Sequence, residues 1–283
     1  MRIAVTGAAG MLAKALLPQL AAAGHEVKAL RRDQADVTNL PALRAAVEPF
    51  APEWVIHLAA FTRVDDCERD VELAYRVNGL GARNAALAAA SCGAAVLAIS
   101  TDYVFDGRGT RPYREYDPIA PLSVYGKSKW AGEQALREAA PRHVIVRTAW
   151  LFGAGGANFV DSILRKARHG EPLAVVDDQR GSPTWTGDLA RALVRLVAAA
   201  EFGTYHCTNG GECTWHELAR HVVTRAGHDV PVERTTTADL ARPAPRPAYS
   251  VLDGSWCEHV TGYRMPHWKD AVDRYLGQVP AVA

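Results

Sequence analysis

Short apolar stretches alternate with helical stretches through the first 150 residues, and no other feature restricts the fold as strongly. Strands are expected at residues 2–6, 27–30, 54–58, 95–100 and 143–148. Helices are expected at residues 11–23, 40–47, 74–90 and from Tyr125 to Ala139. Strands joined by helical crossovers form a parallel sheet that is covered on both faces. The sequence therefore predicts an α/β fold built on a doubly wound parallel sheet.

The alternation becomes less regular after Trp150, where turn residues and prolines are more frequent. Further helices are expected at 159–169, 188–200 and 215–226, with a strand at 203–207. We therefore expect a sheet domain at residues 1–150, to which elements near 173–203 return. Residues 151–283 are expected to form mainly a smaller, interleaved C-terminal lobe.

Composition excludes several classes of protein. The net charge is +1 with no basic block, which argues against a nucleic-acid surface. No run of about 18 apolar residues is present, so no membrane span is expected. The five cysteines include no Cys-x-x-Cys pair, and the N-terminus enters a strand without a charged leader. These features predict a reduced, cytoplasmic protein without a zinc knuckle.

The turn VTGAAGMLA joins the first expected strand to the first expected helix and carries Gly7, Gly10 and Ala13. Residues without side-chain bulk let the backbone approach a pyrophosphate, and the following helix directs free N–H groups and its positive dipole end at that anion. The spacing differs from the common Gly-x-Gly-x-x-Gly fingerprint, but its position in the chain favours a Rossmann-like dinucleotide site over an ordinary glycine turn.

The end of the second strand indicates which dinucleotide is bound. An NAD site usually carries an acid there for the ribose 2′-hydroxyl, whereas this sequence has Arg31 and Arg32. Guanidinium groups pair well with a phosphate, which predicts NADPH as the preferred cofactor with NADH as the alternative. The other interpretation is that both arginines simply face water.

Three reactive groups are expected to meet at the ligand crevice of the sheet. Thr101 follows the strand that ends near Ser100, and Tyr125 and Lys129 are one helical turn apart. Such a trio suits carbonyl reduction: Thr101 would hold the carbonyl oxygen and Tyr125 would supply a proton. The Lys129 ammonium would lower the pKa of the phenol toward the working range of a general acid. The alternative is an ordinary i,i+4 contact on a helix surface.

These residues make the chain similar to the extended short-chain dehydrogenase/reductase family and, within it, to the dTDP-4-dehydrorhamnose reductases. The resemblance covers nearly the whole chain and rests on eight segments: VTGAAGMLA, ADVTN at 35–39, HLAAFTRVDDCE at 57–68, ISTDYVFDG, PLSVYGKSKWAGE, RTAWLFG at 147–153, DDQRGSPTWTGDLA at 177–190 and RPAPRPAYSVLD at 242–253. It implies NADPH-dependent reduction of the 4-keto group of a dTDP-4-dehydro-6-deoxysugar, with dTDP-4-dehydro-L-rhamnose as the favoured substrate.

The resemblance also implies roles for single positions. Thr101, Tyr125 and Lys129 match the catalytic trio, and Lys129 also matches a contact to the nicotinamide ribose. The implied cofactor positions are Gly7, Gly10, Met11, Leu12, Asp36, Val37, Ala59, Ala60 and Thr62. The implied positions around the sugar nucleotide are Val64, Asp102, Tyr103 and Trp150. Gln179, Arg180 and Arg242 are candidates for the substrate diphosphate, with a surface role as the alternative for each.

One position departs from the family. Some members are dimers bridged by magnesium through glutamates, one of which lies on the first helix. That helix here reads MLAKALLPQL, with Ala15 and no acid. We therefore expect no metal site and not that dimer, and a homodimer of another kind is left open.

Two other enzyme classes and one non-enzymatic class share the fold. A 4,6-dehydratase needs an acid pair after the threonine, whereas this chain has Thr101, Asp102 and Tyr103 in succession. An epimerase remains an alternative, although such chains are usually longer. A non-catalytic regulatory subunit is the third possibility. Such relatives tend to lose the reacting residues, whereas all three are present in this chain.

Overall fold

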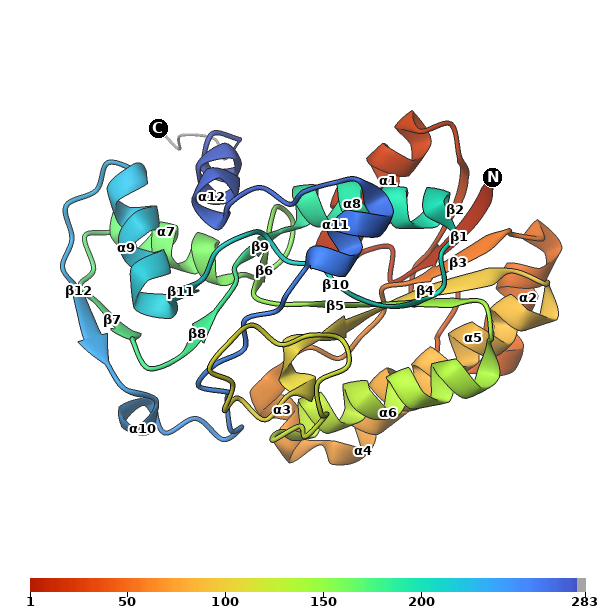
Figure 1. Ribbon diagram of the computed structural model, residues 1–283, viewed down its shortest axis with the longest axis horizontal. Coiled ribbons are helices and arrows are strands. Elements are labelled where there is room, and N and C mark those ends of the chain that lie inside the picture. The colour runs from red at the N-terminus through yellow and green to blue at the C-terminus, as the bar shows by residue number, and fades with distance from the viewer. Residues whose placement is uncertain (279–283) are drawn as a thin grey trace.

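A six-stranded parallel sheet forms the centre of the computed structural model, which describes residues 1–278 (Figure 1). Its order is β10-β5-β4-β3-β1-β2. The strands are β1 (Arg2–Thr6), β2 (Glu26–Leu30), β3 (Trp54–His57), β4 (Ala95–Thr101), β5 (His143–Thr148) and β10 (Gly203–His206). The chain leaves β1 for β2 on one side and continues to β3 and β4 on the other. The carboxyl ends of β1 and β3 therefore border the crevice where such sheets bind ligands.

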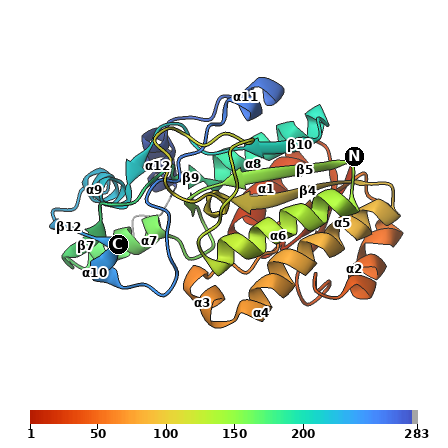
Figure 2. The same ribbon diagram turned by 60° about the horizontal axis from the view of Figure 1, so that its bottom comes forward.

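Helices cover both faces of this sheet, as the rotated view shows (Figure 2). One face carries α1 (Met11–Ala22), α8 (Thr186–Ala199) and α11 (Ser255–Thr261). The other carries α2 (Leu40–Val47), α5 (Gly81–Ser91) and α6 (Val124–Ala139). The strands between them are buried on both sides, which explains why they read as continuous apolar runs in the sequence. The predicted α/β class and doubly wound parallel sheet are confirmed.

The connection from β3 to β4 is more irregular than the single helix that the sequence predicts. It contains α3 (Val64–Arg69), α4 (Val71–Ala74) and a π-helical segment (Tyr75–Leu80) before α5. Short 3₁₀ turns follow α2 (Glu48–Phe50) and β4 (Asp102–Val104). π-Helical turns are frequent at functional sites, and this one faces α6.

A second lobe packs α7 (Phe159–Arg168), α9 (Trp215–Arg225) and α12 (Trp268–Leu276) around a separate apolar core. Its strands form three pairs: β7 (Leu173–Val176) with β12 (Val232–Thr235), β8 (Arg180–Gly181) with β11 (Cys213–Thr214), and β6 (Leu151–Phe152) with β9 (Thr184–Trp185). A short helix, α10, spans Thr237–Leu240. Within the region expected to return to the main sheet, α8 packs on α1, whereas β7 pairs with β12 in the second lobe.

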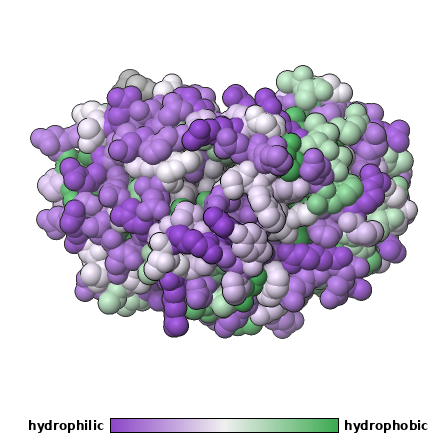
Figure 3. All heavy atoms as spheres, in the orientation of Figure 1, coloured by the Kyte–Doolittle hydropathy of each residue, from purple (hydrophilic) through white to green (hydrophobic). Residues whose placement is uncertain are grey.

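The face seen in Figure 3 is mostly hydrophilic, and hydrophobic residues gather mainly toward the end of the molecule where α1 lies. No helix within residues 1–278 combines the length and the apolar character that a membrane crossing requires. In the same part of the chain, no group of three His, Cys, Asp or Glu side chains is arranged to hold a metal ion.

Candidate active site

The β1–α1 turn has the shape that an anion requires. Gly7 has a φ of +70°, and a Cβ built on it would lie 2.6 Å from the backbone nitrogen of Ala59. This close approach brings the ends of β1 and β3 together. Gly10 is the N-cap of α1, and it provides no side-chain cap; the first turn of the helix contains no acid. Its first N–H groups and its positive dipole end are therefore available to a phosphate, so these residues fit a dinucleotide pyrophosphate.

The segment after β2 holds the two arginines that predict NADPH. Their side chains are 59% and 84% exposed, and each faces a nearby acid: Arg31 lies 3.2 Å from Asp33, and Arg32 lies 3.6 Å from Asp36. The backbone N–H and the hydroxyl of Thr38 donate to Asp36 and hold the pKa of that carboxyl below its usual range. Both guanidinium groups are exposed enough to reorient toward a ligand.

The other expected cofactor positions lie at the start of α1 and in the segments that follow β2 and β3. Met11 and Leu12 open α1, and Ala59, Ala60 and Thr62 follow β3. Val37 is buried, and its carbonyl oxygen accepts a hydrogen bond from Asn84 Nδ2 at 2.8 Å.

The reacting trio is brought to the end of β4 and the start of α6. Ser123 caps α6 by accepting a hydrogen bond from the Gly126 backbone, and Glu68 of α3 accepts one from the Val124 backbone at 2.8 Å. These two contacts fix the first turn of α6 and therefore the position of Tyr125.

The Tyr125 phenol lies against the residues that end β4. It is hydrogen-bonded with Thr101, and the Tyr103 ring packs edge-on against it with centroids 5.6 Å apart. Burial raises the pKa of Tyr125 above its ordinary value, and the neighbouring Asp102 carboxyl raises it further, while the bond to Thr101 lowers it. The phenol is therefore held in its protonated form.

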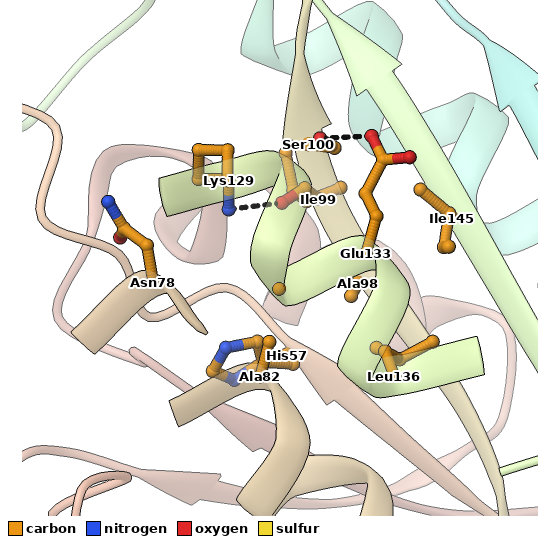
Figure 4. Close-up of a pocket in the computed structure, with 11 residues that line it drawn as sticks. His57, Asn78, Ala82, Ala98, Ile99, Ser100, Lys129, Glu133, Leu136 and Ile145 are labelled. Carbon is orange, nitrogen blue, oxygen red and sulfur yellow. Dashed lines mark hydrogen bonds between the residues drawn. The ribbon is translucent and has the colours of Figure 1, made fainter. Parts of the chain in front are cut away.

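Lys129 adopts a different contact from the expected one. Its side chain is buried, and Nζ donates to the carbonyl oxygen of Ile99 at 2.6 Å (Figure 4). Burial lowers the pKa of Lys129 to about 8, and the Glu133 carboxylate opposes this shift. The expectation that Lys129 lowers the pKa of Tyr125 is wrong for this structure, because burial dominates and the ammonium faces a backbone carbonyl.

Asp102 and Tyr103 follow Thr101 and lie in the short 3₁₀ turn after β4. Asp102 is 2% exposed, and its Oδ1 accepts a hydrogen bond from the Thr101 hydroxyl at 2.9 Å. Burial raises the pKa of Asp102 to about 6. The backbone N–H of Tyr103 donates to Thr101 Oγ1 at 3.2 Å, so the hydroxyl is held from both sides.

Trp150, one of the positions implied around the sugar nucleotide, is packed against a second tryptophan. Its ring stacks on Trp215 with centroids 3.5 Å apart, and a Cβ built on Gly181 would lie 2.5 Å from the ring. Trp215 therefore covers one face of the indole, and the Gly181 backbone lies close against the ring. Trp150 also has a φ of +49°, a left-handed conformation that non-glycine residues rarely adopt.

The remaining substrate candidates lie at the junction of the lobes or in the second lobe. Val64 begins α3. The Gln179 amide bridges Thr237 and Trp215 at 2.8 and 3.1 Å. Arg180 lies 3.5 Å from Glu212, and the 56% exposed Arg242 lies 3.2 Å from Asp65 on α3. Within residues 1–278, no hydrogen bond or ion pair joins these three polar side chains to Tyr125.

Three buried polar residues near the trio were not singled out from the sequence. Asn78 accepts from the Phe61 backbone at 2.8 Å and donates to Ser128 Oγ at 3.0 Å. His57 Nδ1 lies 2.9 Å from the Thr6 hydroxyl, and its pKa is lowered to about 3 by burial and by Lys129. Glu133 on α6 accepts hydrogen bonds from Ser100 Oγ and Arg147 Nε. The sequence signal that could have identified these residues is a polar side chain at a position that the pattern predicts to be buried.

Comparison with known proteins places these observations in context. Residues 1–280 match the family described as RmlD substrate binding domain. A dTDP-4-dehydrorhamnose reductase of Streptomyces griseus is 48% identical over 95% of this chain and 90% of that protein. The spore coat polysaccharide biosynthesis protein SpsK of Bacillus subtilis is 42% identical over 97% of this chain and 96% of that protein.

Solved structures agree with the sequence comparison. A dTDP-4-dehydrorhamnose reductase of Bacillus anthracis in complex with NADP superimposes with a TM-score of 0.95 at 37% identity. The match covers 98% of this chain and 99% of that one.

Proposed function

The chain belongs to the RmlD substrate-binding domain family, and from this premise we propose that it uses NADPH to reduce the 4-keto group of a dTDP-linked 4-keto-6-deoxysugar. The favoured substrate is dTDP-4-dehydro-L-rhamnose, which gives dTDP-L-rhamnose. Relatives at 40–48% identity are named as reductases of such sugars, and a structural neighbour is a complex with NADP. A related keto sugar is the alternative substrate, because the relatives differ in the sugar that their names specify.

The cofactor is assigned to the crevice between the ends of β1 and β3. The pyrophosphate would lie on the turn of Gly7 and Gly10 and on the first N–H groups of α1. Arg31 and Arg32 would hold the adenosine 2′-phosphate, since both are exposed and adjacent to that crevice. When bound, NADPH supplies a hydride to the carbonyl carbon.

The chain's own residues handle the proton and the oxygen. Tyr125 donates its proton to the oxygen as negative charge develops there, and the raised pKa keeps that proton available. The Thr101 hydroxyl turns from Asp102 to the substrate oxygen and holds it by a hydrogen bond. The second lobe would then hold the nucleotide portion of the substrate beside Trp150.

The pairing of Tyr125 with Thr101 at the end of β4 is the observation that carries this proposal. A general acid contributes about 10²–10⁴-fold to a rate, so Tyr125→Phe should lower kcat by that factor. NADPH affinity should change by less than about threefold, because the phenol hydroxyl is one contact among many. Substrate-dependent oxidation of NADPH and a fluorescence titration of NADPH binding measure the two quantities.

The alternatives give different results in the same assay. An epimerase isomerises the sugar without consuming cofactor, and a regulatory subunit produces no change. Either outcome with a panel of dTDP-4-keto-6-deoxysugars would refute the proposal. NMR of the product would identify the sugar and its C4 stereochemistry.

A further inference from the structure

The buried carboxylate of Glu133 lies one helical turn after Lys129 on α6 and is 4% exposed. Its Oε1 accepts hydrogen bonds from Ser100 Oγ at 2.6 Å and from Arg147 Nε at 2.9 Å. Its Oε2 accepts from Nη2 of Arg147 at 2.8 Å and from Nη2 of Arg137 at 3.0 Å. Four donors therefore hold both oxygens in one place.

These contacts join α6 to β4, which ends at the reacting hydroxyl of Thr101, and to the neighbouring strand β5. Ser100 is the residue before Thr101 on β4, and Arg147 is its register partner on β5. A helix that slides along the sheet would break the hydrogen bond between Ser100 and Glu133. The same helix carries Lys129 one turn earlier and Tyr125 two turns earlier, so this bond also sets their distance from Thr101.

Lys129 and Glu133 line the same small pocket of about 10 Å³ (Figure 4). His57 of β3 also lines it, together with the uncharged polar side chains of Asn78 and Ser100. A buried ammonium is stable only when an opposite charge is near. Glu133 supplies that charge from within the same helix.

We propose that Glu133 is a positioning residue of the reduction, which holds α6 in register with the end of β4 and keeps the buried Lys129 ammonium charged. The role in catalysis rests on the proposed function, whereas the effect on the charge of Lys129 does not.

Among the titratable and charged groups around Lys129, Glu133 is the one that stabilises the protonated form of the lysine. His57 is neutral near pH 7, because its pKa is lowered to about 3. Tyr125 on the same helix is protonated, and Arg147 of β5 lies behind Glu133, bound to both of its oxygens. Burial already lowers the pKa of Lys129 to about 8. Without the carboxylate, the pKa falls further and the ammonium loses its proton at neutral pH.

Glu133→Gln tests the charge, because it keeps the size of the side chain and one acceptor oxygen. NMR of isotope-labelled lysine Cε atoms follows each amine in the ligand-free protein, and the chain has only six lysines. The wild-type Lys129 resonance should titrate near pH 8, and Glu133→Gln should shift it down by about one unit or more. Lys129→Met identifies the resonance. An unshifted titration overturns the electrostatic role.

Loss of the carboxylate leaves Arg147 buried without its partner, so Glu133→Gln has a companion variant. Glu133→Gln with Arg147→Met removes both charges, and it should show the same downward shift. Glu138→Gln is the control, because it removes an exposed carboxylate from the same helix and leaves the four hydrogen bonds to Glu133 in place. It should change neither the titration nor kcat.

Ser100→Ala tests the register separately, because it retains the ion pair between Glu133 and Arg147. Its kcat should fall about tenfold with KM for NADPH nearly unchanged, since only the alignment of the trio is affected. An unchanged kcat overturns the positioning role. If wild-type protein reduces no keto sugar, the proposed function fails, and the NMR titration still decides the effect of Glu133 on Lys129.

Discussion

One added methyl group at Gly7 should separate the role of the β1–α1 turn from the ordinary cost of a left-handed alanine. A Cβ at this position would lie 2.6 Å from the Ala59 nitrogen and 2.8 Å from both the Ala59 Cα and the Leu58 carbonyl carbon. All three are backbone atoms, which cannot rotate away. In Gly7→Ala the turn and the segment after β3 must therefore move apart.

The magnitude follows from a matched glycine elsewhere in the chain. Gly93 has a φ of +68°, close to the +70° of Gly7, but no heavy atom lies within 4 Å of a Cβ built on it. Gly93→Ala should therefore lose only the conformational term, about 1 kcal/mol of unfolding free energy. Gly7→Ala adds overpacking against backbone, about 1–3 kcal/mol more.

Urea denaturation and a fluorescence titration with NADPH measure both consequences. NADPH affinity should fall by about tenfold or more in Gly7→Ala, because N–H groups that bind a charged phosphate are each worth about 1.5–3 kcal/mol. Gly93→Ala should bind NADPH as the wild type does. Equal losses of stability in the two variants would refute the close approach, and unchanged NADPH affinity in Gly7→Ala would refute the pyrophosphate assignment.

Two further predictions concern charge. Arg31→Ala with Arg32→Ala should raise KM for NADPH about tenfold and leave KM for NADH unchanged, since only NADPH carries the 2′-phosphate; equal effects on both cofactors would contradict the assignment. Burial raises the pKa of Asp102 in the folded protein from its ordinary value of 3.8 to about 6, so its neutral form favours folding below about pH 4 and that stability is lost as pH rises through 6. At pH 8, Asp102→Asn should therefore raise the unfolding free energy by about 2–3 kcal/mol and raise Tm with it, whereas at pH 4 it should change neither. Thermal denaturation at both pH values measures this, and an equal change at each would contradict it.

The sheet could be predicted because its central strands are buried on both faces. Their sequences are short apolar runs between turn residues, and each is followed by a helical stretch. The two-residue strands of the second lobe could not be predicted, since two residues show no periodicity. Their positions depend on which segments the tertiary structure brings side by side.

The connection between β3 and β4 shows another limit of local patterns. The alanine-rich stretch that begins at Ala74 is typical of one helix, but its first part adopts the π-helical form. That part carries Asn78, whose amide pairs with the backbone N–H and carbonyl of Phe61. The partner lies 17 residues earlier, so no helical propensity encodes the contact.

The same distinction between local pattern and tertiary contact applies to the residues of the site. The end of β4 and the one-turn spacing of Tyr125 and Lys129 were predictable, because a strand end and a helix repeat fix them. The direction of the Lys129 amine and the covering of Trp150 were not, because each depends on a backbone or ring that arrives from elsewhere in the chain.

The raised pKa of Tyr125 also bears on the direction of the proposed reaction. Reduction of a ketone begins with a protonated acid, whereas oxidation of the alcohol begins with its conjugate base. Burial and the Asp102 carboxyl both disfavour the phenolate, so near neutral pH the site starts in the form that reduction needs. The phenolate that remains after proton donation is the unstable state. Its contact with Thr101 opposes the upward shift of the pKa, and the Lys129 ammonium faces the Ile99 carbonyl oxygen instead. Near neutral pH the site is therefore set for reduction of a ketone rather than for oxidation of the alcohol.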